Sequence, residues 1–153
     1  MVGLASLLDL PPLADDLVRV EDALRRSVET ADPFLTEVAG HLITAGGKRL
    51  RPALALTAAY AVAPDAASRP APQESVMGGV SVELVHLGSL YHDDVMDEAP
   101  MRRGAPSVNS RWGNSIAILA GDYLFAHASR LTSTLLSSRT GTRTSQCRLA
   151  LYT

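Results

Sequence analysis

The chain has 153 residues, a length typical of a single domain with one hydrophobic core. Its composition, 46% hydrophobic and 20% charged, is that of an ordinary globular protein, and its net charge of −2 argues against a general nucleic-acid-binding protein. A single cysteine, Cys147, excludes an intramolecular disulfide and fits the reducing cytoplasm. Since no apolar run approaches a membrane span of about 18 residues and the N-terminus lacks a basic leader, we expect a soluble protein without an integral membrane segment or a signal peptide.

Prolines and glycines divide the first 130 residues into helical segments. Asp32-Pro33 interrupts the first helical pattern, Gly46-Gly47 stands where the second helix can end, and Pro52 stands where the third can begin. A proline-rich connection is expected at 64–72 and a polar loop at 98–108. No alternating strand pattern and no internal repeat is present. The helices predicted from apolar spacing cover residues 11–28, 34–45, 52–62, 73–97 and 115–130. Helices joined by short links are typical of a bundle, so the predicted fold class is all-α.

The segment 131–153 differs in character from residues 1–130. It is rich in Ser, Thr and Arg, contains no acidic residue and shows no helical stripe. We therefore expect an irregular C-terminal tail after a helical region at 1–130. Either the tail is disordered, or it was translated from a shifted reading frame; we favour the frameshift.

The most informative motif is Asp93-Asp94-Val95-Met96-Asp97, at the end of the predicted long helix. At 100° per residue, Asp93 and Asp97 lie about 40° apart on the helix, and His86 falls between them. Carboxylates at a helix C-terminus are electrostatically unfavourable unless a cation accompanies them. Oxygen-only ligands suit Mg²⁺ held jointly by carboxylates and substrate phosphates. The alternative is an acidic helix end that is simply solvated.

Two basic clusters could supply the counter-charge for a phosphorylated ligand. The run from Gly46 to Pro52, GGKRLRP, places three cations at a helix N-terminus, and Arg102-Arg103-Gly104 follows the aspartates in the loop. Taken alone, the second cluster could be an exposed basic turn. A diphosphate bridged by Mg²⁺ to the carboxylates and held by arginine would explain all three clusters together.

Four runs together give the sequence a specific resemblance. GGKRLRP, ELVHLGSLYHDDVMDEAPMRRG, PSVNSRWGN and AILAGDYLFA resemble, in order and spacing, the trans-polyprenyl (isoprenyl) diphosphate synthase family over about residues 40–130. The resemblance implies an isoprenoid-synthase helical bundle and a Mg²⁺-dependent prenyltransferase. Such an enzyme ionises an allylic diphosphate and joins it to isopentenyl diphosphate.

The resemblance also implies roles for individual residues. Asp93 and Asp97 match Mg²⁺ ligands, and Asp94 supports them in catalysis. Arg102 matches a contact to the allylic diphosphate. His86 could instead be a core histidine with its hydrogen bonds satisfied. The resemblance assigns binding of the diphosphate of isopentenyl diphosphate to Lys48, Arg51, His86 and Arg103. Arg49, from the same basic run, is grouped with these substrate-binding residues.

The chain also departs from the family pattern. Family members are considerably longer and carry a second aspartate-rich motif downstream, which residues 131–153 cannot supply. We therefore expect an incomplete bundle that is inactive alone. The alternatives are a non-catalytic diphosphate-binding subunit of a full-length partner, in a homodimer or heteromer, and a non-functional remnant. The small residues Gly88 and Ser89 before the aspartates suggest a longer product, although they could equally serve close helix packing.

Overall fold

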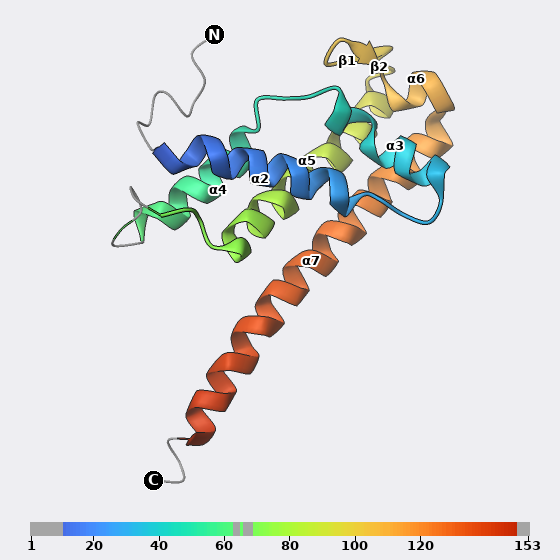
Figure 1. Cartoon of the computed structure of the whole chain (residues 1–153). Coiled ribbons are helices and arrows are strands. Elements are labelled where there is room, and N and C mark those ends of the chain that lie inside the picture. Colours follow the sequence, from blue (N-terminus) through green and yellow to red (C-terminus); the bar gives the residue numbers. More distant parts are fainter. Residues whose placement is uncertain (1–10, 63–64, 66–68, 150–153) are drawn as a thin grey trace.

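The computed structural model describes residues 11–62, 65 and 69–149. The N-terminal residues 1–10, for which no signal peptide was predicted, part of the predicted proline-rich connection and the last four residues of the predicted tail lie outside these ranges. The described elements are α2 (Pro11–Ser27), α3 (Pro33–Thr44), α4 (Leu50–Ala61), α5 (Gln73–Met96), β1 (Met101–Arg102), β2 (Ala105–Pro106), α6 (Val108–Trp112) and α7 (Asn114–Leu149) (Figure 1). The all-α prediction is confirmed.

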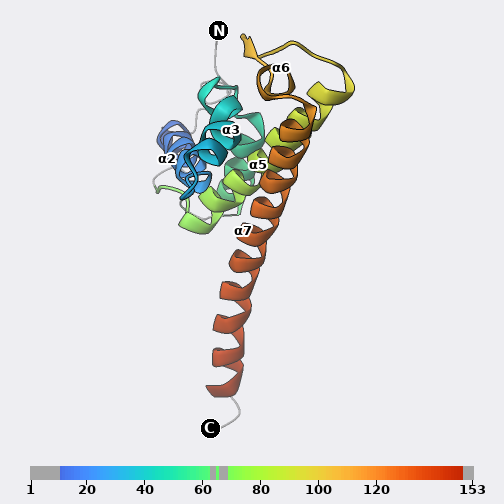
Figure 2. The same ribbon diagram turned by 90° about the vertical axis from the view of Figure 1, so that its right-hand side faces the viewer.

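Helix α5 is the central element. It packs against α7, α4 and α2, and in Figure 2 it lies between α2 and α7. An apolar stripe at helical spacing on this helix is completely buried: Val76, Val80, Leu84, Leu87 and Tyr91. This stripe faces the core, and His86 and Asp93 lie outside it, on the side of α5 that also carries the exposed Val82 and Val85.

The turns that end and begin α3 follow the predicted signals. The Asp32 carboxylate caps the helix by accepting hydrogen bonds from the backbone N–H of Phe34 at 2.8 Å and of Leu35 at 3.3 Å. After the helix, Gly46 has a φ of 85°, a left-handed conformation that favours glycine. The chain can therefore turn sharply into the GGKRLRP run.

Helices α5 and α7 approach closely at Gly88. A Cβ atom at this position would lie 3.0 Å from the carbonyl oxygen of Gly121 and 3.4 Å from the ring of Phe125. The structure thus gives Gly88 a packing role between α5 and α7, while its connection with a longer product stays a prediction.

The segment predicted as a polar loop contains a small hairpin and a short helix. Strands β1 and β2 pair antiparallel, with Met101 opposite Pro106 and Arg102 opposite Ala105. The two turn residues, Arg103 and Gly104, have φ values of 55° and 80°, as in a two-residue turn with both residues left-handed. Strands of two residues and a helix of five are too short to leave a periodic signal in the sequence.

Helix α7 continues well beyond its predicted end at Arg130 and reaches Leu149. The expectation of an irregular tail was therefore wrong for residues 131–149, whereas an origin in a shifted reading frame stays a prediction. No proline interrupts this stretch, and the hydroxyls of Thr132 and Thr134 donate to helix carbonyls one turn earlier, both at 3.0 Å. In both views the end of α7 projects beyond the other helices (Figures 1 and 2). Within the described residues, no helix has both the length and the apolarity needed to cross a membrane.

Candidate functional site

The α3–α4 loop, the middle of α5 and the β1–β2 hairpin meet around a small basic pocket of about 100 Å³. Cations predominate in its wall. The residues that line it are Lys48, Arg49, Leu50, Arg51, Glu83, His86 and Arg103. The structure thus brings together every basic residue that was predicted to bind the diphosphate of isopentenyl diphosphate, although these residues come from three separate parts of the chain.

Gly47 allows two arginines to approach the pocket turn. A Cβ atom at this position would lie 2.8 Å from Nη1 of Arg103 and 2.9 Å from Nη1 of Arg49. Any side chain here would displace one or both guanidinium groups. The second glycine of GGKRLRP is therefore explained by the space that the arginines occupy.

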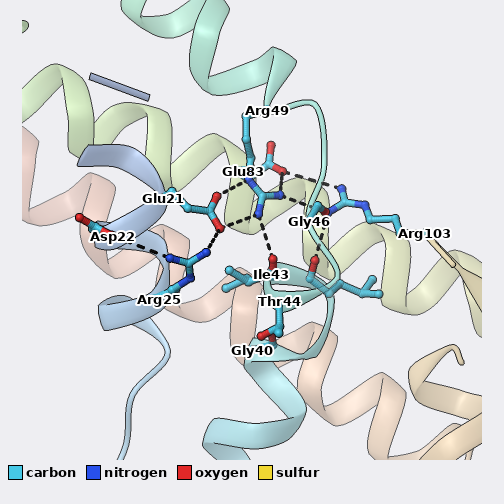
Figure 3. Close-up of polar contacts among 11 residues, drawn as sticks. Glu21, Asp22, Arg25, Gly40, Ile43, Thr44, Gly46, Arg49, Glu83 and Arg103 are labelled. Carbon is cyan, nitrogen blue, oxygen red and sulfur yellow. Dashed lines mark hydrogen bonds and ion pairs between the residues drawn. The ribbon is translucent and has the colours of Figure 1, made fainter. Parts of the chain in front are cut away.

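Arg49 is a buried ion-pair partner within the protein (Figure 3). Its Nε and Nη2 donate to Glu21 at 2.7 and 3.2 Å, and its Nη1 donates to Glu83 at 3.1 Å. Further bonds reach the carbonyls of Ile43, from Nη2 at 3.1 Å, and Gly46, from Nη1 at 3.5 Å. Burial alone would lower the pKa of Arg49, but the hydrogen bonds and charges of Glu21 and Glu83 outweigh it and raise the pKa.

The five bonds of Arg49 equal the five N–H donors of a guanidinium group. In this arrangement the side chain has no free donor for a phosphate. Arg49 therefore forms part of the pocket wall in this arrangement, and its contact with the substrate stays a prediction.

Arg103 is held from two sides. Its Nη1 donates to the carbonyl oxygens of Leu42, at 3.2 Å, and Gly46, while its Nη2 lies 3.8 Å from Oε1 of Glu83. Burial and the nearby charge of Arg49 lower the pKa of Arg103, an effect that Glu83 opposes. The side chain remains 18% exposed, so part of the guanidinium group can face a ligand.

His86 joins the basic pocket to the aspartate motif. Burial, followed by the charges of Arg51 and Arg103, lowers the pKa of His86 to about 4, whereas Asp93 acts in the opposite direction. The imidazole is therefore neutral at pH 7 and offers one hydrogen-bond donor and one acceptor. A neutral donor among cations suits an anionic ligand, because it adds no further repulsion between the cations.

The three aspartates of the motif occupy different environments. Asp97 caps α5 and is exposed, and Asp93, one turn earlier, is half-buried. Asp94 has no exposed surface, and its Oδ1 accepts a hydrogen bond from Nε of Arg102 at 2.6 Å. The pKa of Arg102 is raised, first by this hydrogen bond and then by the charges of Asp97 and Asp93 together with that of Asp94. Arg102 therefore lies beside the aspartates and outside the basic pocket.

Asp93 and Asp97 suit a metal that is completed by other ligands. No group of three or more His, Cys, Asp or Glu side chains in the described part of the chain could hold an ion by itself. Two accessible carboxylates, without nitrogen or sulfur donors, match the way Mg²⁺ binds through one or two carboxylates plus substrate phosphates and water. The donor set therefore fits Mg²⁺ bound together with a phosphorylated ligand.

Two glutamates that organise the pocket, Glu21 and Glu83, were not among the predicted site residues. Glu83 interrupts the apolar face of α5, directly before the buried Leu84, and is itself only 2% exposed. An acidic residue at such a position requires a cationic partner, and this requirement was the available signal. Glu21, on α2, gave no comparable signal because acidic residues are ordinary on a helix surface.

Comparisons with known proteins identify the family of the chain. The family described as Polyprenyl synthetase matches residues 32–150. The nonaprenyl diphosphate synthase of Mycobacterium tuberculosis is 48% identical over 120 residues, which cover 78% of this chain and 34% of that protein. Heptaprenyl diphosphate synthase component 2 of Geobacillus stearothermophilus is 43% identical over 116 residues, covering 76% of this chain and 34% of the relative. The chain thus spans about a third of the length of these relatives.

Solved structures show the same fold. A decaprenyl diphosphate synthase from Rhodobacter capsulatus superimposes with a TM-score of 0.70 at 41% identity, over 80% of this chain and 36% of that one. A polyprenyl synthase from Caulobacter crescentus, complexed with calcium and isoprenyl diphosphate, superimposes with a TM-score of 0.74 at 30% identity, over 88% and 39% of the two chains.

Proposed function

The chain belongs to the polyprenyl synthetase family, and from this premise we propose that it serves prenyl transfer between an allylic diphosphate and isopentenyl diphosphate, with Mg²⁺ as cofactor. One observation carries the proposal: a basic pocket and a pair of accessible carboxylates share helix α5, with His86 electrostatically coupled to both. The Caulobacter relative, complexed with calcium and isoprenyl diphosphate, supports the pairing of a divalent cation with this class of ligand.

The basic pocket binds the diphosphate of isopentenyl diphosphate in this proposal. Lys48 and Arg51 are exposed cations, Arg103 is a partly exposed one, and His86 adds a neutral hydrogen bond. Arginine can hold phosphate oxygens through two parallel N–H bonds. Together these side chains hold the substrate by its charged end and leave its double bond free to react.

The aspartate motif receives the allylic diphosphate. Asp93 and Asp97 would hold Mg²⁺, which, when bound, neutralises negative charge on the diphosphate. Arg102 supports the same leaving group: its Nε and Nη2 face Asp94, which leaves Nη1 available among the described residues. The carbon–oxygen bond breaks with its electron pair leaving on the diphosphate. The double bond of isopentenyl diphosphate then attacks the allylic carbon, and loss of a proton completes the five-carbon extension.

The 153-residue chain by itself is proposed to bind these ligands without turning them over, since it spans about a third of its relatives. A second candidate is a diphosphate-binding subunit that works with a full-length synthase. One relative favours this candidate, because its name designates it as component 2 of a heptaprenyl diphosphate synthase. Association with a second copy or with such a partner, and a cytoplasmic location, stay predictions.

Calorimetric titration of the chain with isopentenyl diphosphate tests the pocket. The substitution Arg51→Gln should weaken binding about tenfold or more, because it removes a cation that faces the ligand. Arg26→Gln is a matched control, because Arg26 is an exposed arginine in the last turn of α2 and does not line the pocket. Equal affinities for the two variants would contradict the proposed site.

A further inference from the structure

Glu83 is an unexpected component of a site for an anion. Its carboxylate lines the basic pocket, and the residue is only 2% exposed. Coulomb's law alone says that such a carboxylate repels a diphosphate and weakens its binding. The prenyl-transfer chemistry described above gives this residue no role.

Glu83 joins two arginines from different segments (Figure 3). Its Oε1 accepts a hydrogen bond from Nη1 of Arg49 at 3.1 Å and lies 3.8 Å from Nη2 of Arg103. Arg49 belongs to the α3–α4 loop and Arg103 to the hairpin turn, and both have left-handed backbones, with φ of 48° and 55°. Non-glycine residues rarely adopt this conformation unless their surroundings hold them in it.

The two guanidinium groups would repel each other without a carboxylate between them. Nη1 of each lies within 3 Å of the point where a Cβ atom of Gly47 would stand, at 2.8 Å for Arg103 and 2.9 Å for Arg49. The charge of Arg49 also lowers the pKa of Arg103, whereas that of Glu83 raises it. Glu83 therefore offsets the repulsion at the place where the two segments meet.

We propose that Glu83 is a positioning residue that strengthens diphosphate binding by holding Arg103, together with Arg49, in the binding arrangement. The inference rests on the proposed diphosphate pocket. Charge alone predicts that removing the Glu83 carboxylate strengthens anion binding. We expect the opposite: its removal weakens anion binding, because Arg103 loses its position.

The test is the affinity of Glu83→Gln for isopentenyl diphosphate, measured by calorimetric titration of the whole chain. Glutamine keeps the shape and one acceptor oxygen, and Glu21 still compensates Arg49. We expect binding about tenfold or more weaker than that of the unmodified chain. Equal or tighter binding would overturn the inference.

Glu74→Gln is the matched control for net charge. Glu74 is exposed in the first turn of α5, about 13 Å along the helix from Glu83, which exceeds the screening length of about 8 Å at physiological salt. The affinity of the Glu74→Gln variant for isopentenyl diphosphate should equal that of the unmodified chain. If the unmodified chain does not bind isopentenyl diphosphate, both the proposed function and this inference fail. If the unmodified chain binds and Glu83→Gln binds equally well, only the inference about Glu83 fails.

A double-mutant cycle separates positioning from a general loss of structure. If Glu83 acts through Arg103, adding Glu83→Gln to Arg103→Gln should weaken binding no further, whereas fully additive losses would overturn the inference. If Glu83→Gln does not unfold in a cooperative transition, the variant Arg103→Lys is tested in its place. Lysine keeps the positive charge but lacks the planar guanidinium group that Glu83 holds. That variant should also bind at least about tenfold more weakly, and unchanged affinity would overturn the inference.

Discussion

Two aspartates of the Asp93–Asp97 motif, Asp94 and Asp97, are predicted to respond in opposite ways to the same substitution. Asp94 has no exposed surface and pairs with Arg102, whose side chain is 29% exposed. Asp97 is exposed at the end of α5, where the helix dipole is negative and Asp93 lies one turn earlier. Replacing either carboxylate by asparagine changes the net charge equally, so a difference between the variants reports the local environment.

The expected magnitudes follow from these environments. Breaking a fully buried ion pair costs about 3–5 kcal/mol, and the partial exposure of Arg102 reduces this to about 2–3 kcal/mol for Asp94→Asn. For Asp97→Asn, relief of the unfavourable helix-end charge contributes about 0.3–1 kcal/mol of stabilisation. The attraction between Asp97 and Arg102 offsets part of this gain. The free energy of unfolding should therefore change by less than about 0.5 kcal/mol or rise slightly.

Urea denaturation followed by circular dichroism measures both effects, and binding in the presence of Mg²⁺ supplies the second readout. Asp97→Asn should abolish the enhancement of diphosphate binding by Mg²⁺ while the protein remains stable. Asp94→Asn should lower the denaturation midpoint. Equal midpoints for the two variants would refute the assignment of Asp94 to the interior and of Asp97 to the metal.

Two further predictions concern helix α5. The unfolded chain protonates histidine near pH 6.5, whereas burial and Arg51 lower the pKa of His86 to about 4 in the folded state, so stability falls as the pH drops from about 7 toward 4. The variant His86→Gln should show a shallower loss of unfolding free energy between about pH 7.5 and 5.5, and identical slopes would contradict the pKa shift. Gly88→Ala should lower the melting temperature, because overpacking against Gly121 costs about 1–3 kcal/mol against a gain in helix propensity of about 1 kcal/mol. Gly78→Ala on the same helix, with open space around it, should raise the melting temperature; equal increases would show that the α5–α7 contact tolerates a larger residue.

The sequence was sufficient for features that depend on local pattern. The apolar residues from Val76 to Tyr91 repeat at helical spacing within the predicted helix 73–97, and they are buried. The Asp32-Pro33 and Gly46-Gly47 signals place the ends of α3 within a residue or two. Such features are encoded within a single segment, so no knowledge of the tertiary arrangement is needed to find them.

Features that depend on contacts between residues far apart in the sequence could not be predicted from a single segment. Arg49 stands in a run of cations that resembles a phosphate site as a whole, yet its donors face Glu21 and Glu83, which lie 28 and 34 residues away. The continuation of α7 was missed for a different reason. Its Ser and Thr residues have modest helix propensity, and the absence of proline was given too little weight against their composition.

The most direct test of the account is a thermal melt of the chain with Mg²⁺, with an allylic diphosphate analogue, and with both together. If Asp93 and Asp97 hold the metal jointly with the ligand's phosphates, the two ligands together should raise the melting temperature more than either alone. Ligand at 100 times its Kd stabilises the folded state by about 2.7 kcal/mol, which corresponds to several degrees for a chain of this size. A cooperative transition whose midpoint rises more with the combination than with either ligand alone is the predicted result. A transition indifferent to both ligands would contradict the claim that this chain forms a metal-assisted diphosphate site.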